Sequence, residues 1–103
     1  MINHVVVVGN LTADVETKMF GDTMGARFTV ACNMSKERVY YIPIEVWGKT
    51  AEAAAKYLAK GSKVGVEGFI KTGSYTDKNG ITRKTFAIDA STIEYCDYKD
   101  GKK

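Results

Sequence analysis

VYYIPIEVW, which runs from Val39 to Trp47, has the period-two alternation of a half-buried β-strand. One face of this strand carries the aliphatic side chains of Ile42, Ile44 and Val46. The other face carries Tyr41, Pro43, Glu45 and Trp47. Pro43 cannot donate a ladder hydrogen bond, so the middle of the strand is predicted to be incompletely paired. The alternation places Tyr41 and Trp47 on the side that faces away from the core.

A helix is predicted directly after this strand. Thr50 suits the N-cap of a helix over Ala51–Lys60, and Gly61 suits the C′ position beyond it. The apolar stripe of this helix consists of Ala51, Ala54, Ala55 and Leu58. Because so narrow a stripe lets a helix approach a sheet closely, we expect the helix to plug one end of a barrel.

Two strands are predicted before Val39. Val5–Val8 is an unbroken β-branched run, typical of a strand that is buried on both faces or used in a contact between subunits. Ala26–Asn33 alternates apolar and polar residues and follows a turn region at Gly21–Gly25. Cys32 falls on the apolar row, so we expect it to be a small buried hydrophobe rather than a nucleophile.

Two further strands follow the helix and form a long hairpin. The first spans Lys63–Tyr75, and Gly68 within it allows a bend. Its inward residues are Val64, Val66 and Ile70, and its outward residues are Lys63, Glu67, Phe69, Lys71 and Tyr75. Asn79-Gly80 predicts a type I′ turn, and the last strand spans Thr82–Ile93.

The order of these elements is three strands, a helix and two strands. It predicts an all-β fold with one helix: a five-stranded Greek-key barrel of the oligonucleotide-binding type (OB-fold), with the helix between the third and fourth strands. A chain of 103 residues has room for one core. We therefore expect one domain over residues 1–96 and a short polar tail over residues 97–103.

Composition and missing motifs exclude several classes of function. A net charge of +3 permits a polyanionic partner without requiring one. The longest apolar run, Val5–Val8, is far shorter than the ~20 residues of a membrane span, so a cytoplasmic protein is expected. Cys32, Cys96 and the single His4 lack zinc-ligand spacing, and no disulfide is expected in a reducing compartment. Without a phosphate-binding loop or a nucleophile elbow, we expect no enzyme, metal or cofactor.

Several short stretches occur in one order along the chain: Val8–Leu11, Arg27–Ala31, Val46–Lys49, Ala51–Glu52, Tyr57–Leu58, Lys60–Ser62, Val66–Gly68, Tyr75–Asp77 and Asn79–Gly80. Together they resemble the bacterial single-stranded DNA-binding protein family, including its phage and plasmid members. The resemblance implies an oligonucleotide-binding fold, a homotetramer or a dimer, and single-stranded DNA bound without reading its sequence. It also implies a nucleoid-associated role in DNA replication, recombination or repair.

Binding of single strands requires aromatic faces for the bases and cations for the phosphates. The stacking positions of the family match Tyr41, Trp47 and Tyr75, while Lys36 stands where the family has another tryptophan. The outward rows add Phe69, which serves equally well in a subunit interface. The expected phosphate contacts are Arg27, Lys49, Lys71, Arg83 and Lys84, with Lys36 and Lys78 contributing from loops.

Several alternatives stay open. Trp47 could cap the barrel against the helix, and Glu45 and Glu67 either pair with the lysines or mark subunit contacts. The loop Met34–Arg38 is shorter than is usual in the family. The end Asp97–Lys103 lacks the acidic tip that recruits partners in the family, so we expect no recruitment through it, in a short phage-like member or a truncated chain. The alternative function is an accessory protein of the primosomal kind that bridges protein partners and DNA.

Overall fold

The computed structural model describes residues 1–96, and the expected tail at residues 97–103 lies outside this range. The elements are β1 (Val5–Leu11), β2 (Glu16–Phe20), β3 (Thr23–Ser35), β4 (Arg38–Trp47), α1 (Gly48–Tyr57), β5 (Lys63–Thr76) and β6 (Thr82–Tyr95). The helix lies between β4 and β5, as predicted. Within residues 1–96, no helix is long and apolar enough to cross a membrane.

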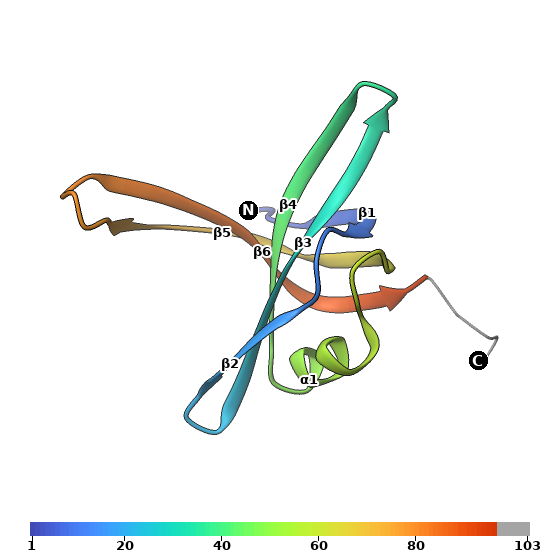
Figure 1. Cartoon of the computed structure of the whole chain (residues 1–103), viewed down its shortest axis with the longest axis horizontal. Helices are drawn as coiled ribbons and strands as arrows, with labels where there is room; N and C mark the ends of the chain where they lie inside the picture. Colours follow the sequence, from blue (N-terminus) through green and yellow to red (C-terminus); the bar gives the residue numbers. More distant parts are fainter. Residues whose placement is uncertain (97–103) are drawn as a thin grey trace.

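The sheet closes on itself (Figure 1). Its strand order is β1-β5-β6-β4-β3-β2, and β1 also pairs with β3 at Asn10↔Ala31 and Leu11↔Val30. β4 and β6 run parallel where Ile44 faces Ile88, and the other neighbours are antiparallel. The ring therefore contains β1, β3, β4, β6 and β5, while β2 lies outside it as an extension of β3. This arrangement confirms the predicted oligonucleotide-binding barrel.

β2 was not predicted from the sequence. This strand pairs with the first part of β3, from Glu16↔Arg27 to Phe20↔Thr23, and all five of its residues are exposed. A strand exposed on both faces has no apolar alternation, which is why periodicity did not reveal it. The predicted turn region at Gly21–Gly25 is consequently too long, because β3 already begins at Thr23.

The core lies inside the ring and under the helix. Its largest fully buried side chains are Val30, Ile44, Val46, Val64, Val66 and Ile88. Cys32 is 8% exposed within this core, as predicted, and it is a free cysteine. On β1, Val5 and Val7 pack against the core, but Val6 and Val8 are 62% and 53% exposed. Burial of β1 on both faces is therefore wrong for the single chain.

The helix starts and ends earlier than predicted. Trp47, not Thr50, is the N-cap, because Gly48 at φ 63° turns the chain from β4 directly into the helix. Leu58 is the C-cap, three residues before Gly61. The residues Ala51, Ala54 and Leu58 face the core as predicted, but Ala55 is exposed. The predicted burial of Ala55 is wrong because only part of the predicted apolar stripe, formed by Ala51, Ala54 and Leu58, contacts the barrel.

The β3–β4 and β5–β6 hairpins extend beyond the barrel, as does the β2–β3 hairpin (Figure 1). The β5–β6 register shifts at Glu67/Gly68, and a Cβ on Gly68 would lie 2.1 Å from the carbonyl oxygen of Asp89. Gly68 therefore allows the predicted irregularity. The inward placement of Ile70 is wrong, since this side chain is 40% exposed where β5 leaves the core. The Asn3 side chain exchanges two hydrogen bonds with the backbone of Ile70, at 2.9 and 3.0 Å.

The turn of the β5–β6 hairpin is not type I′. Its closing hydrogen bond joins Asp77 N–H to the carbonyl of Ile81, and Gly80 N–H donates to the carbonyl of Asp77. The loop therefore has three residues, with Gly80 at φ 81°. Asp77 Oδ1 accepts hydrogen bonds from the N–H groups of Asn79 and Ile81. These bonds favour the longer turn over the one that Asn-Gly alone predicts.

Candidate nucleic-acid interface

Trp47 lies on the outer face of the sheet at the end of β4. Its side chain is 38% exposed, and its ring meets Phe20 edge to face, with centroids 5.2 Å apart. A Cβ on Gly25, the residue opposite Trp47 on β3, would lie 2.7 Å from the Trp47 ring. The ring therefore packs over the β3 backbone rather than inside the barrel, because Gly25 has no side chain there.

A hollow of about 390 Å³ lies beside Trp47, bounded by Lys18, Phe20, Gly25, Arg27 and Glu45 among others. A second hollow of about 210 Å³ is lined by Arg27 and Glu45 and continues to the middle of β5 and β6. Its other lining residues are Lys71, Thr72 and Gly73 on β5 and Thr85, Phe86 and Ala87 on β6. We call the two together the outer groove. They share two residues, so the groove runs from β2 across β3 and β4 to the β5–β6 hairpin.

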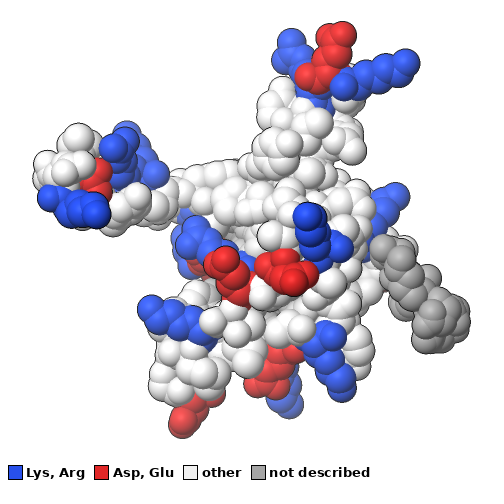
Figure 2. Space-filling model, in the orientation of Figure 1, with Lys and Arg blue, Asp and Glu red and all other residues white. Residues whose placement is uncertain are grey.

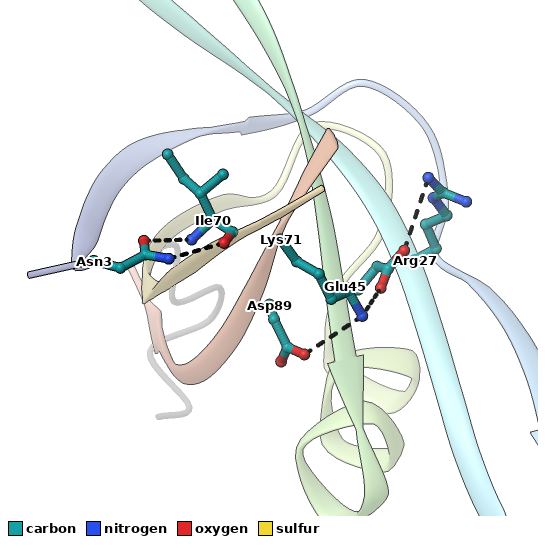
Figure 3. A network of polar contacts seen from close by, with 6 residues as sticks. All are labelled: Asn3, Arg27, Glu45, Ile70, Lys71 and Asp89. Carbon is teal, nitrogen blue, oxygen red and sulfur yellow. Dashed lines mark hydrogen bonds and ion pairs between the residues drawn. The ribbon is translucent and has the colours of Figure 1, made fainter. Parts of the chain in front are cut away.

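Three residues that line the outer groove, Arg27, Glu45 and Lys71, form a network of charges with Asp89 (Figure 3). Lys71 Nζ lies 2.7 Å from Glu45 Oε1 and 3.6 Å from Asp89 Oδ2. Arg27 Nη2 lies 3.9 Å from Glu45 Oε2. The hydrogen bond to Glu45, together with both carboxylate charges, raises the pKa of Lys71 against an opposing effect of burial. Lys71 Nζ is also 5.5 Å from the Trp47 ring centroid.

Adjacent strands bring this network together. Arg27 faces Glu45 across β3–β4, and Glu45 faces Asp89 across the parallel β4–β6 pair. The three side chains thus form one row on the outer face of the sheet. Of the two alternatives for Glu45, pairing with a lysine is the one observed; Glu67 instead lies 2.7 Å from His4 Nε2.

The other predicted aromatic residues are exposed but dispersed. Tyr41 is 66% exposed on the β3–β4 hairpin, six residues and about 20 Å of strand from Trp47. Phe69 is 43% and Tyr75 56% exposed on β5, where they face Asp89 and Arg83. Lys71 lies between them on the same side of the strand. Trp47 and Lys71 therefore lie together at the outer groove. Tyr41 lies on the β3–β4 hairpin, and Tyr75 lies on the β5–β6 hairpin.

The predicted cations outside the groove differ in their surroundings. Arg83 Nε donates to Asp77 Oδ2 at 3.0 Å, whereas Lys84 faces Ser74 and so points to the opposite side of the hairpin. Lys36, Lys49 and Lys78 are exposed at the β3–β4 turn, the start of α1 and the β5–β6 turn. Figure 2 shows mainly basic side chains, with acidic ones among them, at the ends of the β3–β4 and β5–β6 hairpins, and a mixture of acidic and basic side chains over the body.

Lys18 and Phe20 are among the residues of the groove that were not predicted from the sequence. Lys18 Nζ lies 5.4 Å from the centroid of the Phe20 ring, and both residues line the hollow beside Trp47. They lie on β2, which carried no periodic signal. No group of three or more His, Cys, Asp or Glu side chains in residues 1–96 could hold a metal ion.

Comparison with known proteins identifies relatives along almost the whole chain. The sequence model of the Single-strand binding protein family matches residues 2–96. Single-stranded DNA-binding protein 3 of Clostridium acetobutylicum is 38% identical, over 94% of this chain and 72% of the relative. The single-stranded DNA-binding protein of Wolinella succinogenes is 33% identical, over 100% of this chain and 69% of the relative. Single-stranded DNA-binding protein 1 of Nostoc sp. is 33% identical, over 98% of this chain and 88% of the relative.

Proposed function

The chain belongs to the single-strand binding protein family, and we propose that it binds single-stranded DNA without sequence preference along the outer groove. The observation that carries this proposal is the position of Trp47, an exposed aromatic ring beside a groove that also contains Arg27 and Lys71. Every base has a face that can stack on such a ring, whatever its identity. The relatives are named for the same ligand.

The proposed DNA-binding residues extend from the groove onto both hairpins. Trp47 and Tyr41 stack bases from β4, and Phe69 and Tyr75 do so from β5. Phosphates are bound by Arg27, Lys36, Lys49, Lys71, Lys78, Arg83 and Lys84. Exposure of all four aromatic side chains supports these roles. Lys84 serves a strand that passes over the other side of the β5–β6 hairpin.

The proposed activity is binding and protection of single strands, not catalysis. Its place is the cytoplasm, at the nucleoid, where replication, recombination or repair exposes single strands. We propose residues 1–96 as the DNA-binding domain, a boundary supported by the family match over residues 2–96.

We also propose that β1 joins copies of the chain into a homotetramer, or at least a dimer. Val6 and Val8 lie on the same, outward face of β1, and they are 62% and 53% exposed. In residues 1–96, the β3-facing edge of β1 is paired only at Asn10 and Leu11. An apolar strand with a free edge is suited to pairing with its copy across a two-fold axis.

A titration with oligo(dT) of increasing length tests the proposed function. Trp47 is the only tryptophan, so its fluorescence reports on one site. We expect quenching that saturates at a defined number of nucleotides and weakens as salt is added. Unchanged fluorescence, together with no shift of a labelled oligo(dT) in a gel, would rule the proposal out.

A further inference from the structure

Lys71 belongs to a small network of ion pairs on the outer face of the sheet. Glu45 and Asp89 bind Lys71 from β4 and β6, and Arg27 approaches the second oxygen of Glu45 from β3. This network therefore contains two cations and two carboxylates, so its formal charges cancel. The Glu45 and Asp89 side chains are only 20% and 22% exposed, so water screens these pairs less than pairs on an open surface.

We infer that Glu45 and Asp89 compete with DNA phosphate for Lys71 and Arg27, and that these two carboxylates set the affinity and the salt dependence of binding. The inference rests on the proposed function. A carboxylate presents the same kind of charged oxygen acceptor to an ammonium or guanidinium group as a phosphate does. In the free protein the carboxylates occupy the donors that a strand in the groove would use.

Binding then exchanges one ion pair for another instead of forming a new one. When a phosphate takes Lys71, Glu45 loses its closest cation and attracts a counterion from solution. This uptake offsets part of the counterion release that normally drives binding to single strands, about 0.7 per phosphate contact. Lys71 should therefore contribute less to the salt dependence than an unpaired lysine on the rim of the groove.

The position of Lys71 links this exchange to base stacking. Its Nζ lies 5.5 Å from the centre of the Trp47 ring while it is bound to Glu45. A base that stacks on the exposed side of Trp47 brings its own phosphate within reach of the same ammonium group. Glu45 and Asp89 are thus positioning residues, which hold Lys71 beside Trp47 until a nucleotide replaces them.

The test measures binding of dye-labelled oligo(dT) by fluorescence anisotropy at several salt concentrations. Glu45→Gln should bind about two- to fivefold more tightly at low salt, as expected for removal of a competing ion pair. Its log–log salt slope should be steeper than that of the wild type by up to about 0.7. Asp89→Asn should change both quantities in the same direction but less, because its oxygen is 3.6 Å from Lys71 rather than 2.7 Å.

Two controls separate competition from a general effect of charge. Glu94→Gln removes one negative charge from an exposed position near the end of β6 that belongs to no ion pair within residues 1–96, and it should leave the slope unchanged. In a Lys71→Ala background, Glu45→Gln should steepen the slope less. Circular dichroism melting confirms that each variant is folded.

Equal affinity and slope in folded Glu45→Gln and wild type would overturn the competition, as would an equal effect of Glu45→Gln with and without Lys71. Both results leave binding by the wild type intact. Failure of the wild type itself to bind oligo(dT) would instead overturn the proposed function.

Discussion

At the scale of single residues, a substitution of Trp47 distinguishes a role in DNA binding from a role in the core. Its ring is partly exposed and packs on Gly25 and Phe20 outside the core. We expect Trp47→Ala to weaken binding of oligo(dT) by about 1–3 kcal/mol, the usual contribution of one base–aromatic stack, and to leave the melting temperature close to that of the wild type. Anisotropy titration and thermal melting provide the two measurements.

Trp47→Phe is the matched control for this change, because it keeps an aromatic face at the same place and should retain most of the affinity. A folded Trp47→Ala variant with unchanged affinity would contradict the stacking role. A loss of about 3–5 kcal/mol in folding stability would show instead that the ring acts as a core side chain.

The side on which each residue of β4 lies was predictable from period-two alternation. Ile44 and Val46 are fully buried, while Tyr41 and Trp47 are exposed, as the pattern requires. The ion-pair partners of Lys71 were less accessible to sequence reasoning. Glu45 and Asp89 become neighbours only through the parallel pairing of β4 with β6. No local pattern in either strand specifies that register.

At the scale of elements, the β5–β6 turn depends on one carboxylate. Asp77 accepts hydrogen bonds from Ile81 N–H, from Arg83 Nε and from Asn79 N–H, and these bonds hold its pKa below the ordinary value of 3.8. The ionised Asp77 carboxylate therefore stabilises the folded turn, and this stabilisation is complete at pH values above the ordinary pKa of an aspartate. This contribution is lost as the pH falls through the lowered value.

We therefore expect Asp77→Ala to speed hydrogen exchange at the amides of Asn79 and Ile81, measured by NMR near neutral pH. Asp77→Asn keeps the oxygen that faces these amides but loses the charge that holds Arg83, so its exchange rates should lie between those of Asp77→Ala and wild type. Equal protection in all three proteins would show that the Asp77 side chain does not stabilise the turn.

β2, the start of α1 and the β5–β6 turn each differ from the sequence-based prediction for a separate physical reason. β2 lacks a buried face, so no periodicity marks it. The helix begins at Gly48 because a glycine with positive φ follows β4 at once, and this conformation outweighs the capping preference of Thr50. Asn79-Gly80 marked the hairpin correctly, but Asp77 hydrogen bonds lengthened the turn by one residue.

At the scale of the whole molecule, the outward valines of β1 predict the oligomeric state. Val6→Lys places a charge in the proposed contact between copies and should lower the mass measured by light scattering at micromolar concentration. Ile81→Lys is the control, because Ile81 is 49% exposed at the β5–β6 turn, whereas β1 pairs with β5 only over Lys63–Gly68. A wild-type monomer, or the same assembly for Val6→Lys and wild type, would contradict the proposed assembly.

The closed barrel follows from the order of its elements, so the sequence sufficed to predict it. The helix between the third and fourth strands of the ring and the long last hairpin allow few other arrangements. The extent of the groove did not follow in the same way, because β2 adds Lys18 and Phe20 to it from outside the ring.

The contrast between the two cysteines makes the protein suitable for labelling at a single site. Burial raises the pKa of the Cys32 thiol and shields it, whereas Cys96 is exposed just beyond β6. The N–H of Cys96 donates to the carbonyl of Lys63, at the opposite end of β5 from the hairpin turn. A maleimide dye should therefore attach at Cys96 alone, where it can follow DNA binding optically without occupying the outer groove.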